Sequence, residues 1–124
     1  MTLAETKAFL HTFWVAAETR PVFFIFHDPR VDLGALTRLG LPTPQITTDL
    51  SAFANRAGQK IPAKGLRQID TQRLYKGFAR RNERVSLEKG LKSVNKEAQA
   101  LHNAGNDAYY TMELFIAMMD SAPL

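Results

Sequence analysis

Three short polar stretches of the chain contain residues that could act together in binding or catalysis. The first holds His27, Asp28 and Asp32, the second holds Asp70, and the third runs from His102 to Asp107. Carboxylate oxygens bind hard divalent cations, and a histidine beside them can accept a proton. The first two stretches each follow a strand-like run, and sites in α/β sheets assemble at the carboxyl ends of parallel strands. These residue types therefore point to a site that binds a metal ion or a phosphate.

Each of these residues also has a purely structural interpretation. Aspartates at the start of a helix, such as Asp28 and Asp32, are often caps that stabilise the helix by about 0.5–1 kcal/mol. Asp70 is more simply interpreted as another cap, and His27 as a hydrogen-bonded structural histidine. The stretch from His102 to Asp107 is harder to explain in this way, because the Asn-Ala-Gly-Asn between its ends is too polar and too small for a core.

The elements that must position these residues alternate between helices and strands. Thr2 and Glu5 have capping-box spacing, and apolar residues then recur every three or four positions, which predicts a helix over 3–18. The continuous apolar run Val22–Phe26 predicts a strand buried on both faces. A second strand is predicted over Leu66–Ile69. A helix followed by a buried strand indicates an α/β layered domain.

Four more helices are expected along the chain. One ends at Gly40, one follows the second strand, one is capped by Ser86, and the last runs from about 103–105 to 119. Residues 41–64 are difficult to assign, with one helical turn expected over 50–57. The apolar positions expected to face the core are Leu33, Leu36 and Leu39, then Leu74 and Phe78, then Leu87, Leu91 and Val94, and finally Ala108, Met112, Phe115 and Met119.

The stretch His102-Asn103-Ala104-Gly105-Asn106-Asp107-Ala108-Tyr109-Tyr110-Thr111 resembles the third motif of DEDDh exonucleases, a His-x4-Asp pattern. The string HNAGNDA followed by an aromatic residue and Thr is similar, more narrowly, to the fungal branch of these exonuclease-like domains that includes Argonaute-interacting and mRNA-export-related members. The stretch His27–Leu33 resembles the second motif, and Ile69-Asp70-Thr71-Gln72-x-Leu74 resembles a recurrent segment of these domains. The resemblance covers roughly residues 2–119.

This resemblance implies the C-terminal part of a ribonuclease H-like 3′–5′ exonuclease domain, with residues 1–124 forming a single partial domain. It implies a truncated α/β fold, in which a short, mainly parallel sheet is flanked by helices and lacks the first three strands. In such enzymes four carboxylates hold two Mg²⁺ or Mn²⁺ ions, and the substrate is RNA or DNA. Asp32 and Asp107 match the metal-binding carboxylates of the second and third motifs, and His102 matches the general base. Asp70 matches a position that is not counted as catalytic.

The first DEDDh motif, an Asp-x-Glu on a first strand, does not occur in these 124 residues. Glu5 and Glu18 belong to the predicted N-terminal helix, so neither replaces it. Because two carboxylates alone hold Mg²⁺ poorly, we expect a degenerate module, a pseudoenzyme that binds nucleic acid or protein and is not catalytic alone. The alternatives are an active hydrolase whose missing carboxylates come from another chain, a truncated fragment without separate activity, and an unrelated phosphate- or metal-binding domain built on His27, Asp28 and His102.

Positive charge is concentrated in the second half of the chain. Between Arg56 and Lys96 there are twelve Lys or Arg and three acidic residues, a local excess of +9, against a net charge of +4 for the whole chain. Such a distribution favours a polyanionic partner such as RNA or DNA, although an ordinary solvated surface would look the same. The residues expected to bind nucleic acid are Arg67, Arg73, Lys76, Arg80, Arg81 and Arg84.

The sequence contains no cysteine, which excludes a disulfide framework and thiolate metal sites. Its apolar runs are shorter than the roughly 18–20 residues that a membrane span needs, and the N-terminus does not look like a signal peptide. These features predict an intracellular protein, cytoplasmic or nuclear, without a membrane partner.

The strand Val22–Phe26 would lack its usual neighbour if the first strand is missing. An apolar strand with an uncovered edge is a template for aggregation, so we expect something to cover it. A symmetric homodimer is favoured, because such a contact needs only one surface patch. The alternatives are pairing with the segment Gln45–Asp49, a different protein partner, or the N-terminal helix folded across the edge.

Overall fold

The computed structural model describes residues 2–47, 63–79, 84–99, 101 and 104–121. The helical turn expected over 50–57 lies outside these residues. The elements, in chain order, are α1 Leu3–Ala16, β1 Pro21–Phe26, α2 Arg30–Arg38, β2 Gln45–Ile46, β3 Gly65–Asp70, α3 Thr71–Ala79, α4 Leu87–Ser93 and α5 Ala104–Ser121. The described part of the chain is thus a mixed α/β structure, as expected of a truncated ribonuclease H-like fold. None of the described helices is long and apolar enough to cross a bilayer.

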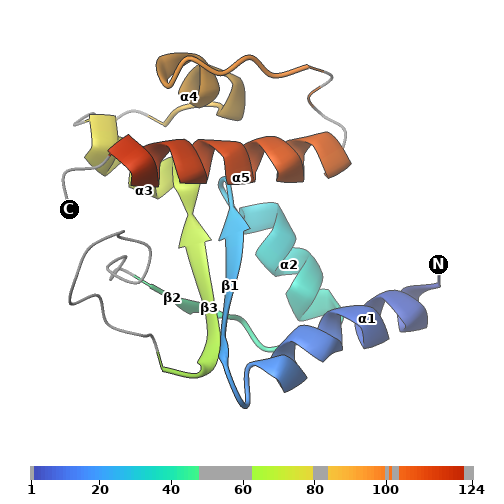
Figure 1. Cartoon of the computed structure of the whole chain (residues 1–124). Helices are drawn as coiled ribbons and strands as arrows, with labels where there is room; N and C mark the ends of the chain where they lie inside the picture. The colour runs from blue at the N-terminus through green and yellow to red at the C-terminus, as the bar shows by residue number, and fades with distance from the viewer. Residues whose placement is uncertain (1, 48–62, 80–83, 100, 102–103, 122–124) are drawn as a thin grey trace.

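Among the described residues the sheet has three parallel strands in the order β1-β3-β2. The register pairs Pro21 with Gly65 and Phe26 with Asp70, so β1 and β3 end at the same level. Residues that follow the two strands are therefore brought together, as the sequence predicted. Figure 1 shows α3, α4 and α5 gathered at the arrowhead ends of these strands, while α1 lies toward their other end.

Burial of β1 differs from the prediction. All six of its residues are half-buried rather than buried on both faces. Phe24 packs on α1, with its ring 5.6 Å from that of Phe13 and 5.5 Å from that of Trp14, measured between centroids. Within the described residues β1 pairs only with β3, so its other edge carries no strand. An edge strand keeps part of its surface accessible, which explains the half-burial.

Two of the alternatives for covering that edge are wrong for the described residues. Gln45 and Ile46 pair with β3, on the side of the sheet away from β1. Helix α1 contacts both β1 and β3, so it lies across a face of the sheet rather than along the free edge. The homodimer and the separate protein partner stay as predictions.

The core lies mainly between α3, α4 and α5. It is built from Tyr75, Leu91, Leu114 and Met118, of which the last three are fully buried. Gly90 of α4 allows this close packing, because a Cβ atom there would lie 3.1 Å from Cδ2 of Leu114.

The buried face of α5 is only partly the predicted one. Phe115 is buried and Met119 packs against the core, as predicted, whereas Ala108 is exposed and Met112 is 44% exposed. The other buried residues are Thr111, Leu114 and Met118. Almost every residue between positions 108 and 119 is apolar, so the spacing alone did not single out one face.

The predicted helix ends are largely confirmed. The Thr2 hydroxyl accepts the amide of Glu5, whose carboxylate accepts the amide of Thr2, as in a capping box. Ser86 caps α4 by accepting the amide of Lys89. Gly40 follows α2 with a φ of +76°, a backbone conformation that glycine adopts without strain. Helix α1 ends at Ala16, two residues before its predicted end.

Candidate active site

A cavity of about 590 Å³ lies at the carboxyl end of β1 and brings together residues from four elements. Asp32 comes from α2 and Asp107 from α5, and both line this cavity. His27 lines it from the end of β1, and Glu88 from the first turn of α4. The two carboxylates that the sequence proposed as metal ligands therefore share one cavity. Their catalytic roles stay predictions.

Asp32 lies in the first turn of α2. Desolvation of the carboxyl raises its pKa, although the residue as a whole is exposed, and the negative charge of Asp28 raises that pKa further. A hydrogen bond from the backbone amide of Asp32 opposes both effects and does not cancel them. The charged form of Asp32 is therefore less favourable in the folded chain than in water.

Asp107 lies in the first turn of α5 and is half-buried. One turn later, the Thr111 hydroxyl donates to the backbone carbonyl of Asp107 over 2.7 Å, and Thr111 itself is buried in the same cavity wall. This contact anchors the first turn of the helix, which carries the carboxylate.

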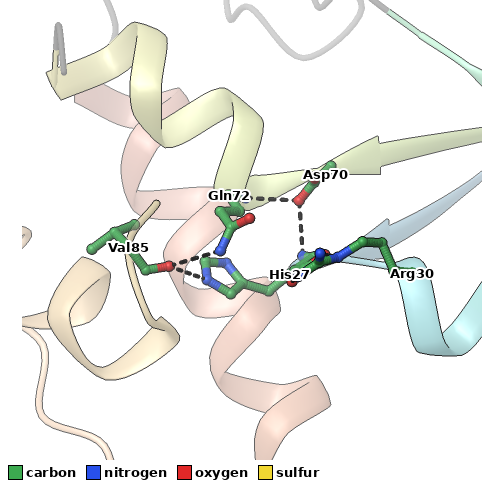
Figure 2. Close-up of polar contacts among 6 residues, drawn as sticks. His27, Arg30, Asp70, Gln72 and Val85 are labelled. Carbon is green, nitrogen blue, oxygen red and sulfur yellow. Dashed lines mark hydrogen bonds and ion pairs between the residues drawn. The ribbon is translucent and has the colours of Figure 1, made fainter. Parts of the chain in front are cut away.

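A hydrogen-bond network joins the ends of β1 and β3 (Figure 2). Oδ1 of Asp70 accepts the backbone amides of Asp28 and Gln72, each over 2.9 Å. The Thr71 hydroxyl donates to the carbonyl of Phe26 and also lies 2.8 Å from Nδ1 of His27. Asp70 therefore caps α3 and ties β1 to β3, in agreement with its structural interpretation.

The same network holds the segment that leads into α4. The carbonyl oxygen of Val85 accepts a hydrogen bond from Nε2 of His27 over 2.8 Å and another from Nε2 of Gln72 over 3.2 Å (Figure 2). Both ring nitrogens of His27 are therefore engaged. His27 serves as a structural histidine between β1, α3 and the residue before the Ser86 cap.

Asp28 is also committed to a structural contact. Its carboxylate accepts Nε of Arg30 over 2.7 Å and Nη2 over 2.6 Å. These hydrogen bonds are the main reason why the pKa of Asp28 is lowered and the pKa of Arg30 is raised. Asp28 has a φ of +56°, an uncommon conformation for a residue other than glycine, and its amide is held by Asp70. A metal site built on His27 and Asp28 would have to break these contacts.

The oxygen donors in the cavity fit part of a Mg²⁺ or Mn²⁺ site. Hard cations prefer carboxylate oxygens, and Asp32 and Asp107 supply two such groups. The third acid, Glu88, forms an ion pair with Lys92 over 3.5 Å. No cluster of three or more histidine or acidic side chains placed to hold a metal occurs among the described residues. Sequence reasoning missed Glu88 as a cavity residue, because only the packing of α4 against α5 brings it there.

The remaining predicted site residues are distributed unevenly. His102, Arg80 and Arg81 lie outside the described residues. Arg67 is held on the sheet, where Nη1 donates to the carbonyl of Ala63 over 2.7 Å and the guanidinium lies 5.9 Å from the ring centroid of Phe23. The other three, Arg73, Lys76 and Arg84, line a second cavity.

The raised pKa of Asp32 predicts that Asp32→Asn stabilises the fold at neutral pH. A carboxyl with a higher pKa in the folded than in the unfolded state lowers stability as pH rises above the unfolded-state pKa, and has no such effect below it. Urea denaturation should therefore give a higher midpoint for the variant at pH 7 and no difference near about pH 3. Glu97→Gln, which removes an exposed charge from a loop, serves as the control. A lower midpoint for Asp32→Asn at pH 7 would contradict this account.

The chain is similar to a known protein family and to fungal proteins. The protein family described as DNA polymerase III subunit epsilon-like, C-terminal domain, matches residues 2–118. An uncharacterised protein of Saccharomyces cerevisiae is 30% identical over 97 residues, which cover 78% of this chain and 20% of that protein. An uncharacterised nucleolar protein of Schizosaccharomyces pombe is 37% identical over 79 residues, which cover 58% of this chain and 32% of that protein.

This chain thus spans between a fifth and a third of the length of these relatives. No solved structure matches it. The family match extends from the capping box of α1 almost to the end of α5, and so includes Asp32 and Asp107. The chain therefore belongs to the DEDDh C-terminal family, the DNA polymerase III subunit epsilon-like C-terminal domains, and is an exonuclease-like module.

Proposed function

We propose that residues 1–124 form one half of a two-metal exonuclease site, bind nucleic acid, and are not catalytic without a further segment. The observation that carries this proposal is the presence of Asp32 and Asp107, from helices far apart in the sequence, in the wall of one cavity. Membership of the DEDDh family supports the same assignment. His102 precedes α5 and is our candidate for the general base.

Asp32 and Asp107 would hold Mg²⁺ or Mn²⁺ in this proposal. When bound, such ions stabilise the attacking and leaving oxygens of a phosphodiester displacement. The two aspartates would orient the ions, and the positive charge of the ions would balance the negative charge of the two carboxylates. The two further carboxylates come from an Asp-x-Glu outside residues 1–124, because this sequence contains none.

The free edge of β1 is where we place the strand that carries this Asp-x-Glu. The cavity lies at the carboxyl end of β1, so a strand paired with β1 would have one of its ends close to the cavity. Helices α1 and α5 both contact β1. Each also has exposed apolar residues, Phe9 at 57% on α1, and Tyr109 and Ile116 at 60% and 48% on α5. An added segment that packs on these helices would cover them.

The relatives extend well beyond the matched region, which supports a source for this strand in a longer chain or a partner. A second copy of the chain at the same edge would instead give a homodimer, and light scattering at micromolar concentration distinguishes these outcomes. Because one relative is nucleolar, we propose a nuclear location for this protein too.

Nucleic-acid binding is expected to depend on Arg73, Lys76 and Arg84. None of the three belongs to an ion pair within the described residues, so their charges are available to phosphates. Removing one cation that neutralises a phosphate should reduce the slope of log affinity against log salt by about one.

The double variant Arg73→Gln, Arg84→Gln should therefore bind an oligonucleotide more weakly, with a slope reduced by about two. The matched control is Lys7→Gln, Arg38→Gln, which removes the same charge from α1 and α2 and should leave the slope unchanged. Fluorescence anisotropy over a salt series measures both. Equal slopes for the two double variants, or no binding at low salt, would contradict nucleic-acid binding by this surface.

A further inference from the structure

A second cavity, of about 490 Å³, lies between α2, β2, β3 and α3. Its lining combines apolar side chains, such as Leu33, Ile46 and Leu74, with the cations Arg73 and Arg84 and others. Cavities of about 300–1,000 Å³ accommodate small organic ligands. This cavity has the size and the mixed surface for a ligand that is apolar on one side and anionic on the other.

The second cavity and the candidate active site share a wall. Gln72 and Arg84 line the second cavity, whereas His27 and Ser86 line the first. The carbonyl of Val85 lies between them and accepts hydrogen bonds from His27 and Gln72 (Figure 2). A ligand in the second cavity would therefore be next to the active-site cavity but outside it.

Charge in the second cavity favours an anion. The two carboxylates in its lining are already engaged, because Asp28 is paired with Arg30 and Asp70 accepts two backbone amides. Within the described residues Arg73, Lys76 and Arg84 form no ion pair, and Arg84 interacts with Asp28 only through the charge that lowers the pKa of that carboxyl. Arg73 and Lys76 are three residues apart on α3, so they project from neighbouring positions of one helix face.

An apolar wall beside a group of cations matches the two parts of a nucleotide. The flat, weakly polar base can leave water for the apolar side chains, and its phosphate can stay at the cationic rim. In a duplex the bases are stacked and paired, so a base can enter a pocket only after leaving the stack. An acidic peptide would also be attracted, but flat apolar groups are not regular features of such a peptide.

We propose that this second cavity binds one nucleotide of a single strand, with the base against Leu33, Ile46 and Leu74 and a phosphate at Arg73 and Arg84. This inference rests on the proposed nucleic-acid binding and adds two properties to it. Single strands should bind more tightly than duplexes. The preference should depend on the open volume of the cavity as well as on charge.

Gly77 offers a way to fill the cavity without changing any charge. It lines the second cavity, and a Cβ atom added there would have no neighbour within 4 Å. A leucine at this position would therefore extend into open space beside Arg73 and Leu74. Gly34 on α2 is the matched control, because its added Cβ also meets nothing within 4 Å and it does not line the cavity.

The experiment compares Gly77→Leu and Gly34→Leu in the full chain. Anisotropy would measure binding of a labelled DNA strand of about 15 nucleotides and of the same strand in a duplex. We expect Gly77→Leu to weaken single-strand binding about tenfold and duplex binding little, and Gly34→Leu to change neither. Thermal denaturation of both variants serves as the check that they are folded.

The outcomes separate this inference from the proposed function. Unchanged single-strand affinity in Gly77→Leu, together with a normal effect of Arg73→Gln and Arg84→Gln, would overturn the nucleotide pocket and leave charge-driven binding intact. Equal affinity of the unmodified chain for strand and duplex would overturn it too. If Gly77→Leu instead abolished binding of an acidic, leucine-containing peptide and left DNA binding unchanged, the cavity would be a peptide site.

Discussion

Residues 1–124 purified alone should not degrade RNA or DNA in the presence of Mg²⁺. A fusion protein that places the first three strands of a DEDDh exonuclease, with their Asp-x-Glu, ahead of Thr2 should gain Mg²⁺-dependent 3′–5′ digestion. The physical reason is the number of carboxylates, since two aspartates bind Mg²⁺ weakly whereas four can hold a pair of ions. Labelled single-stranded RNA and DNA, followed by gel electrophoresis over time, provide the measurement.

The variants of this fusion define which residues form the site. Asp32→Asn and Asp107→Asn should each reduce the rate at least about a thousandfold, because each removes a proposed metal ligand. Glu88→Gln is the matched control, since Glu88 lines the same cavity but is paired with Lys92. Digestion by residues 1–124 alone that is abolished in His102→Ala would contradict the requirement for a second segment.

The expected rise in stability of Asp32→Asn makes this experiment easier to interpret. Residues at functional sites are often unfavourable for stability, and replacing them then stabilises the fold. Desolvation of its carboxyl and the nearby negative charge of Asp28 place Asp32 in this class. An inactive Asp32→Asn protein that is more stable than the unmodified one is inactive because its site has changed and not because it has unfolded.

Local features of the fold were predictable from the sequence because their causes are local. The capping box of Thr2 and Glu5, the Ser86 cap and the turn at Gly40 each depend on residues within a few positions. The strand Val22–Phe26 was also correctly located, one residue short of its observed start. These features depend on backbone hydrogen bonding and on the conformations each residue type allows.

Packing was harder to predict, because it depends on partners distant in sequence. The apolar run in β1 indicates a strand whether that strand is central or at an edge of the sheet. Its place at the edge leaves it half-buried. Helix α5 is apolar over most of its length, so the choice of Thr111 and Leu114 rather than Met112 for the buried face is made by α3, α4 and β1.

The candidate site was also predictable only in part. Sequence motifs indicate Asp32 and Asp107, and the structure brings both to one cavity. The contacts of His27 with Thr71 and Val85 join positions 44 and 58 residues away, and no spacing in the sequence indicates them. The second cavity was not predictable either. The sequence indicates Arg73, Lys76 and Arg84 as candidate nucleic-acid-binding residues, but the apolar wall beside them comes from α2, β2 and α3, which only the fold brings together.

The central claim is that Asp32 and Asp107 are two halves of one metal site, and Mn²⁺ titration followed by NMR tests it most directly. Paramagnetic Mn²⁺ broadens the amide signals of nearby residues, so it locates the ion without any need for activity. We expect weak binding, with a dissociation constant on the order of millimolar, and broadening around Asp32 and Asp107 together. Asp32→Asn and Asp107→Asn should each remove the broadening at both positions, whereas Glu97→Gln should not. Broadening around Asp107 that survives Asp32→Asn, or that gathers around other carboxylates, would contradict a shared site.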